Sequence, residues 1–152
     1  MNYPKEFDEL INNFYEIERI LTAIEKKPRT YGTDQLLHSG EAHTLKAIAE
    51  NEGITQKDIS ELMYRTKGAT SLMIDKLVKK GLITKSPGQG DQRKTTLYLT
   101  EKGKSVNDNH LKYDDAWIAT WFQSLQIPRE KLIIANNVIK ECLENYKETF
   151  MK

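Results

Sequence analysis

The sequence predicts a mainly α-helical protein with one short β-hairpin in its middle. Apolar residues recur at three- and four-residue spacing near both ends of the 152-residue chain, which is the period of amphipathic helices. Residues 82–99 instead combine an apolar start, a cluster of turn-forming residues and an alternating β-branched stretch, which indicates two paired strands. With 30% charged and 9% aromatic residues, the composition is that of a globular protein rather than a disordered one.

The N-terminal third of the chain predicts two helices. The first is expected at roughly residues 4–26, where apolar residues follow a helical period until Pro28 ends it. A loop leads to Ser39, whose hydroxyl suits an N-cap, and a second helix runs from there to about Asn51, with Gly53 after its end. The inward positions of this second helix are predicted to be Ala42, Leu45, Ile48 and Ala49.

Two shorter helices separated by a tight turn are expected next. The first begins near Thr55, and the second covers about residues 67–80 with Thr66 as its N-cap and Gly81 after its end. The apolar periodicity continues through both, so each should bury one face. The predicted inward residues are Ile59, Leu62, Met63, Thr70, Met73, Ile74 and Leu77.

A hairpin and two longer helices complete the prediction. Leu82 and Ile83 begin a strand, residues 86–91 (SPGQGD) form the turn, and residues 95–99 return. Thr100 should then cap a helix that reaches about Gln126, and Pro128 lies near the start of the last helix.

The apolar stripes of the first and last helices are wide for a domain of this size. We therefore expect both ends of the chain to pack against a second copy, with a monomer that carries a helical cap as the alternative.

Charge is sorted along the chain although the net charge is only +1. Residues 54–104 hold 11 Lys and Arg against 5 Asp and Glu, whereas the remainder holds 12 against 17. A basic centre on a nearly neutral protein favours one face that meets phosphates. A helix-turn-helix followed by a basic hairpin, or winged helix-turn-helix, also has a shape that fits DNA: its second helix enters the major groove and its wing reaches the minor groove.

In the second short helix, the face opposite the apolar positions is predicted to contact DNA. Lys67 can reach a guanine edge or a phosphate, Ser71 can exchange a hydrogen bond with a base edge, and Leu72 fits against a thymine methyl group. Gly68 lets the helix backbone come close to DNA. Lys76 lies beside this face.

The hairpin should supply the minor-groove contact. Arg93, near its tip, is the expected minor-groove residue, and Asp91 can hold its guanidinium through paired hydrogen bonds. Free amides at Thr55 and Gln56, where the preceding helix opens, suit a phosphate. The complete set of predicted DNA-binding residues is Thr55, Gln56, Thr66, Lys67, Gly68, Ser71, Leu72, Lys76, Lys85, Asp91, Arg93 and Lys94.

Three segments resemble the winged helix of the MarR family of bacterial transcription regulators: ITQKDISELM, TKGATSLMIDKLVKKGLI and DQRKTTLYLTEKG. The third is the most specific, because an aspartate, an arginine two residues later and a strand that ends in Leu-Thr-x-x-Gly form that family's wing signature. In this sequence the signature residues are Asp91, Arg93, Leu99, Thr100 and Gly103. The order of elements over the whole chain also matches the family.

The resemblance implies one domain over residues 1–152, with a DNA-binding lobe at 36–104 and dimerisation helices at 1–27 and 105–152. It further implies a homodimer on a pseudo-palindromic operator, where binding usually blocks transcription and a small ligand, metal or oxidant usually releases it. Leu72 departs from the family pattern, which often has a polar or basic residue at that position.

Two kinds of effector site are expectations from the residues. His43 lies on the second helix, and His110 and Asp114 lie one turn apart on the helix after the hairpin, a spacing that can bind one metal. The resemblance supports zinc here, because zinc-sensing members place ligands on these two helices. The alternative is that His43 is a packed or hydrogen-bonded helix residue and that His110 is solvated.

An organic effector is the second expectation, in a cleft lined by aromatic residues. The predicted contacts are Tyr15, Tyr31, His38 and Trp117, with simple core packing as the alternative. Redox sensing is not expected, since Cys142 lies on an apolar face of the last helix.

Several classes of protein are excluded or disfavoured. The sequence has no run of about 18 apolar residues and no signal-peptide pattern, so a cytoplasmic protein is expected. A single cysteine excludes an internal disulfide framework. Neither a convincing Ser/His/Asp arrangement nor a phosphate-binding glycine loop is present, so an enzyme is not expected. A winged helix that binds protein instead of DNA remains the alternative.

Overall fold

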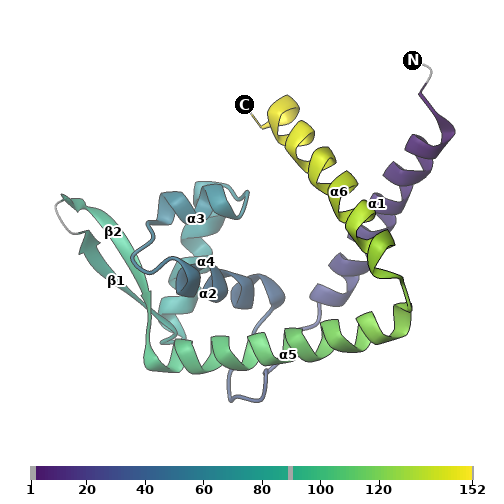
Figure 1. The fold of residues 1–152 in the computed structure, drawn as a ribbon. Coiled ribbons are helices and arrows are strands. Elements are labelled where there is room, and N and C mark those ends of the chain that lie inside the picture. The colour runs from purple at the N-terminus through teal and green to yellow at the C-terminus, as the bar shows by residue number, and fades with distance from the viewer. Residues whose placement is uncertain (1–2, 89–90, 152) are drawn as a thin grey trace. The chain divides into compact units, whose positions relative to one another are not determined.

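The computed structural model describes residues 3–88 and 91–151, and for residues 91–93 it describes the backbone only. The described residues form six helices and one two-stranded antiparallel sheet, which confirms the predicted mainly α fold class (Figure 1). In chain order the elements are α1 (Lys5–Glu25), α2 (Ser39–Glu50), α3 (Gln56–Leu62), α4 (Lys67–Lys79), β1 (Ile83–Gly88), β2 (Asp91–Leu99), α5 (Glu101–Leu125) and α6 (Arg129–Phe150).

The chain divides into two compact units, and the boundary lies inside α5. The first unit, Met1–Tyr113, holds α1 to α4, the hairpin and the first half of α5. The second unit, Asp114–Lys152, holds the rest of α5 and α6. The predicted division into a lobe at 36–104 and flanking dimerisation helices stays a prediction.

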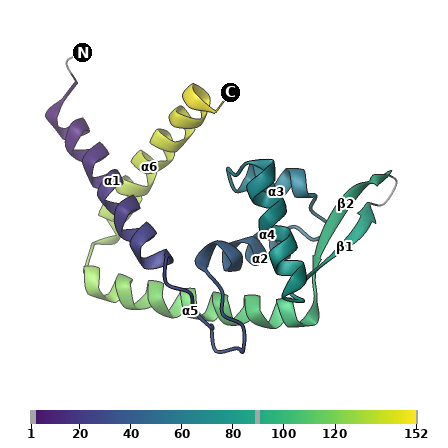
Figure 2. The same ribbon diagram turned by 180° about the vertical axis from the view of Figure 1, so that it is seen from behind.

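The core of the first unit joins α2, α3, α4, the hairpin and the start of α5. Apolar side chains that are separated by long stretches of sequence meet there, and their burial is the main driving force for folding. Figure 2 shows the three central helices clustered beside the base of the hairpin. The fully or almost fully buried apolar residues are Leu37, Ala42, Leu45, Ile48, Ile59, Ile74, Leu77, Leu82, Ile83, Leu97 and Val106.

The N-cap of α2 is His38 and not Ser39, so that prediction was wrong by one residue. Glu41, at the third helical position, accepts a hydrogen bond from the backbone N–H of His38 at 3.0 Å. This bond satisfies the cap amide, which allows Ser39 to enter the helix as its first residue. The hydroxyl of Ser39 then lies 3.4 Å from Nδ1 of His43, one turn further along α2.

Both helices of the helix-turn-helix begin at a threonine cap. Thr55 accepts a hydrogen bond from the N–H of Asp58 at 3.2 Å, and Thr66 accepts one from the N–H of Ala69 at 3.2 Å. The prediction that Leu62 lies in the core was wrong, because this side chain is 51% exposed. Helix α3 ends at Leu62, and the side chain of Met63, which was also predicted to face inward, packs against the core from a non-helical backbone position.

The hairpin is longer than predicted. Strand β2 begins at Asp91 rather than Thr95, and Pro87 and Gly88 belong to β1 instead of the turn. Both strands are edge strands, so the missing N–H of Pro87 is tolerated there, and the register shifts between Pro87 and Gly88. Residues 89 and 90, the centre of the predicted turn, lie outside the described residues.

The Leu-Thr-x-x-Gly motif at the end of β2 has a structural explanation. The Thr100 hydroxyl donates a hydrogen bond to the carbonyl of Gly81 at 2.7 Å and accepts one from the N–H of Gly103 at 3.0 Å. A Cβ atom at Gly103 would lie 1.9 Å from the carbonyl oxygen of Leu82. The threonine caps α5, and the glycine lets α5 pack directly against the chain at Leu82.

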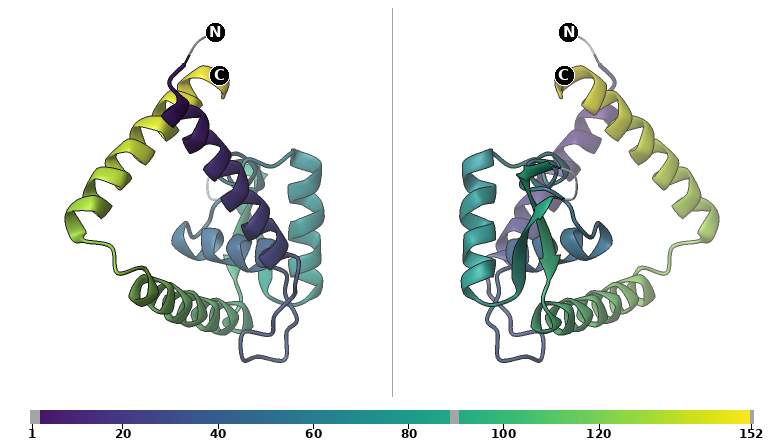
Figure 3. Two further views of the ribbon diagram at one scale, coloured as in Figure 1. Left: turned by 90° about the vertical axis from the view of Figure 1, so that its right-hand side faces the viewer. Right: turned by 90° about the vertical axis from the view of Figure 1, so that its left-hand side faces the viewer.

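The second unit exposes much of its apolar surface. No residue of α6 is buried among those that the structure describes, and α6 follows α5 after a short connection at residues 126–128 (Figure 3). Within the first unit, α1 likewise contributes no buried residue to the described core. None of the described helices combines the length and apolar character that crossing a membrane requires.

Candidate nucleic-acid interface

Helix α4 presents a polar face on the side opposite its buried residues. Thr70, Ile74 and Leu77 are completely buried, and the helical period places Gly68, Leu72, Asp75, Lys76 and Lys79 on the exposed side. The predicted recognition residues Lys67, Gly68, Leu72 and Lys76 are thus exposed, as is the cap Thr66. Ser71 is only partly exposed, on the flank of this face.

The start of α3 and strand β2 come together beside this helix. Thr55, Gln56 and Lys57 line a shallow pocket of about 390 Å³ with Asp58, Lys94 and Thr95. Three of these residues, Thr55, Gln56 and Lys94, were predicted to bind DNA, and the structure places them around one pocket. The hydrogen bond from the Thr55 hydroxyl, at 2.7 Å, holds the pKa of Asp58 below its ordinary value.

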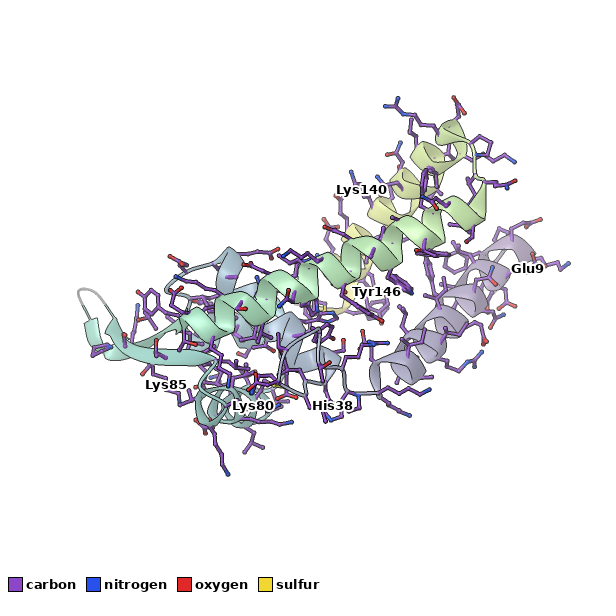
Figure 4. All side chains as sticks on the ribbon, turned by 90° about the horizontal axis from the view of Figure 1, so that it is seen from below. Glu9, His38, Lys80, Lys85, Lys140 and Tyr146 are labelled. Carbon is purple, nitrogen blue, oxygen red and sulfur yellow. The ribbon has the colours of Figure 1, made fainter. Side chains whose placement is uncertain are left out.

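An ion pair joins α4 to the hairpin. The Lys85 ammonium lies 2.6 Å from Oδ1 of Asp75, so α4 and β1 are linked on their exposed sides. Figure 4 labels Lys85 on β1 and Lys80 at the end of α4. Both partners are exposed, so the pair contributes little stability, but it neutralises a carboxylate on the exposed side of α4.

A buried carboxylate holds the last turn of α4, and the sequence did not predict it. Glu41 on α2 is completely buried, with Lys80 Nζ at 2.6 Å from Oε1 and Lys76 Nζ at 3.3 Å from Oε2. Lys80 also donates to the carbonyl of Leu36 at 2.8 Å. We call these residues, Glu41, Lys76 and Lys80, the Glu41 cluster. Lys76, predicted to contact DNA, is thus directed to Glu41 in this structure.

Burial raises the pKa of Glu41, but hydrogen bonds from Lys80, the His38 N–H and Lys76 outweigh that effect. The pKa of this carboxyl therefore lies below its ordinary value, and the group is charged at neutral pH. Glu41 thus links α2 to the end of α4, and losing one partner would leave a buried charge without full compensation.

The side chains of two predicted wing residues, Asp91 and Arg93, are not described. The backbone of Asp91 and Arg93 belongs to β2, but the side chains of residues 91–93 are not described. Their predicted roles, with Arg93 in the minor groove and Asp91 holding it, therefore stay predictions.

The histidines predicted as metal ligands do lie close together. The His43 and His110 rings have centroids 5.4 Å apart, and their ligand nitrogens lie within 4.8 Å. Asp114, one turn beyond His110 on α5, offers a carboxylate oxygen within the same distance of the His110 ring. His110 is buried and the other two are partly exposed. Two imidazoles and a carboxylate are donors that zinc accepts.

Of the four residues predicted to line an effector cleft, only Tyr31 borders a described pocket. Tyr31, buried and with a positive φ of 50°, borders a pocket of about 570 Å³ in the first unit. The other predicted contacts, Tyr15, His38 and Trp117, are not among the residues described as lining it. That lining instead consists of Pro28, Arg29, Thr30, Tyr31, Gly32, Leu36, Asn109 and Tyr113.

Comparison with known proteins identifies the family. The MarR family model matches residues 37–95. The uncharacterized HTH-type transcriptional regulator YybA of Bacillus subtilis is 32% identical over 91 residues, which are 60% of this chain and 61% of that protein. The structure of a MarR transcriptional regulator from Methanosarcina mazei Go1 is 27% identical to this chain, with a TM-score of 0.70. The match covers 96% of this chain and 100% of that one. Residues 37–95 thus match the MarR family, and these relatives support a MarR-family winged helix-turn-helix regulator.

The same fold is found in a solved structure that contains DNA. Streptococcus pneumoniae FabT in complex with DNA is 18% identical, with a TM-score of 0.72 over 95% of this chain and 97% of FabT. The chain spans less than two thirds of the length of the curated relatives it matches. The family resemblance predicted from the three segments is confirmed, and the relatives are named as regulators, as expected for a chain that is not an enzyme.

Proposed function

We propose that this MarR-family protein is a sequence-specific, DNA-binding transcriptional regulator that acts as a homodimer. The observation that carries the proposal is the exposed face of α4, which stands beside a basic hairpin and is held from behind by the Glu41 cluster. In this proposal α4 enters the major groove, the hairpin reaches the minor groove, and phosphates meet the start of α3. Since its target would be chromosomal DNA, we place the protein in the cytoplasm.

The exposed apolar side chains of α1 and α6 support a dimer. A soluble chain rarely leaves contiguous apolar surface in water unless a partner covers it. On α1 the exposed residues include Phe7, Ile17, Ile20 and Leu21, and on α6 they include Ile133, Ile134, Val138, Leu143 and Tyr146.

Dimerisation also sets the target. Two recognition helices read half-sites about one helical turn, roughly 34–36 Å, apart, so a pseudo-palindromic operator is expected.

A binding titration tests this function. The full chain is titrated against DNA fragments that flank its own gene at two salt concentrations, and nanomolar, sequence-dependent binding is expected. Lys67→Gln removes an exposed ammonium at the start of α4, so it should weaken binding and lower the salt slope by about one. Lys112→Gln, an exposed position on α5, is the matched control. Weak binding that is equal for all sequences would instead support a protein-interaction module.

We further propose that DNA binding represses transcription and that a small effector releases it. An effector that prefers a dimer with the wrong half-site spacing would shift the population away from DNA. Zinc is one candidate, and the proximity of His43, His110 and Asp114 favours it.

Calorimetric titration with zinc tests that candidate. Asp114→Asn keeps the side-chain shape and should weaken zinc binding more than about tenfold, which is the cost of losing even an outer-shell partner. His38→Ala, an exposed histidine at the foot of α2, should leave it unchanged. Equal zinc affinity in the wild type and Asp114→Asn contradicts this site.

A further inference from the structure

Leu72 has no packing role in the fold. It is 74% exposed, whereas Ile74 and Leu77 of the same helix are completely buried. Its neighbours on the exposed face of α4 include the charged residues Asp75 and Lys76. A single exposed leucine is common on protein surfaces and by itself needs no explanation. A glycine on the same face of α4 indicates that the exposed Leu72 has a function.

Gly68 lies one turn before Leu72, on the same face of α4. Its backbone is helical, without a positive φ, and a Cβ atom there would meet nothing within 4 Å. The fold therefore does not require glycine at this position, although glycine within a helix lowers stability relative to alanine. Gly103 is the contrasting case, because a Cβ atom there would collide with the backbone at Leu82. Gly68 thus leaves open space directly beside Leu72.

We infer that Gly68 and Leu72 together recognise a thymine in the major groove, with Gly68 admitting the duplex and Leu72 contacting the 5-methyl group. This inference rests on the proposed function, in which α4 is the recognition helix. Leucine has no hydrogen-bonding group, and the thymine methyl is the one apolar feature among the major-groove edges of the four bases. Leu72 is also in the N-terminal half of α4, the half that contacts base edges in such motifs.

The charges around this pair fit a close approach of DNA. Asp75, one turn after Leu72, would repel phosphates if it were unpaired, and the ammonium of Lys85 lies 2.6 Å from its carboxylate. Lys79 continues the same face and is exposed. Leu72 can therefore contact the thymine methyl group while the basic residues around it contact phosphates.

Selection followed by removal of single methyl groups tests the inference. The full chain is first used to select binding sites from random double-stranded DNA. Each thymine of the selected site is then replaced in turn by deoxyuridine, which lacks only the 5-methyl group. At one thymine in each half-site the wild-type affinity should fall about fourfold, as expected for one methyl group returned to water.

Leu72→Ala should bind the thymine and deoxyuridine duplexes equally at that position. Leu36→Ala, an exposed leucine before α2, is the matched control and should keep the fourfold difference. The inference is overturned if deoxyuridine has no effect at any position, or if Leu72→Ala shows the same loss as the wild type. If no sequence is enriched at all, the proposed function fails instead.

Gly68→Ala separates DNA contact from fold. Alanine should raise the melting temperature, because it is the better helix former and meets no neighbouring atom. It should lower affinity for the selected duplex at the same time, because the added methyl occupies the space that the duplex needs. An affinity that is unchanged or improved would contradict close approach at Gly68.

Discussion

Replacing Lys80 by methionine should destabilise the first unit by about 2–3 kcal/mol at pH 7. Lys80 Nζ donates to Glu41 Oε1 at 2.6 Å, and Glu41 is completely buried. Removing one partner of a buried ion pair typically costs about 3–5 kcal/mol, because the other charge is left without compensation. In this protein Lys76 and the backbone N–H of His38 still contact the carboxylate, so the expected cost lies below that range.

The effect should depend on pH in a defined direction. In the wild type the pKa of Glu41 lies below its ordinary value of 4.5, so the pairing stabilises the fold above about pH 4.5 and is lost as pH falls further. Without Lys80, burial is no longer outweighed to the same degree and the pKa of Glu41 rises. The variant can then protonate Glu41 in mild acid, so its deficit relative to the wild type should shrink as the pH falls from 7 toward 4.5.

Urea denaturation, followed by circular dichroism at one protein concentration and several pH values, measures this difference. Lys79→Met removes an exposed ammonium from the same helix and should change stability by less than about 0.5 kcal/mol at every pH. A deficit for Lys80→Met below about 1 kcal/mol at pH 7, or one that grows in acid, would refute the assigned role of the Glu41 cluster.

Two further changes test the packing of the fold and the predicted dimer. Gly103→Ala places a Cβ atom 1.9 Å from the carbonyl oxygen of Leu82, so it should cost about 3 kcal/mol or more in urea denaturation, whereas Gly68→Ala should not destabilise. Ile139→Glu puts a charge on the apolar side of α6 that also carries Leu143 and Tyr146, and should convert the predicted dimer to monomer in sedimentation equilibrium. Asn137→Glu, an exposed polar position on the opposite side of α6, should leave the dimer intact; equal behaviour of the two variants would contradict an α6 interface.

Local sequence patterns were enough to predict most of the elements. The period of apolar residues located the helices, and Thr55 and Thr66 marked the starts of α3 and α4, because an N-cap acts within one turn of its own residue. The same holds for the Leu-Thr-x-x-Gly motif, where Thr100 caps the helix that contains Gly103.

Predictions of individual residues were wrong where neighbouring residues or strand pairing, and not the local sequence pattern, decided the local structure. Leu62 has helical spacing from Ile59, but α3 stops there and Met63 takes the inward position. Ser39 has the chemistry of an N-cap, but Glu41 already satisfies the amide of His38. The turn residues Pro87 and Gly88 extend β1, because pairing with β2 outweighs their turn preference at an edge.

By itself, the sequence determined the order of the helices and the hairpin, the basic centre and the exposed face of α4. Each of these depends on residues within a few positions of one another, and the period of the backbone relates them directly. Only the tertiary structure decided that Glu41 holds Lys80, which lies 39 residues away, and that His43 faces His110. It also decided that Gly103 is indispensable to the packing and Gly68 is not, since the surroundings of a glycine depend on chain segments distant in sequence.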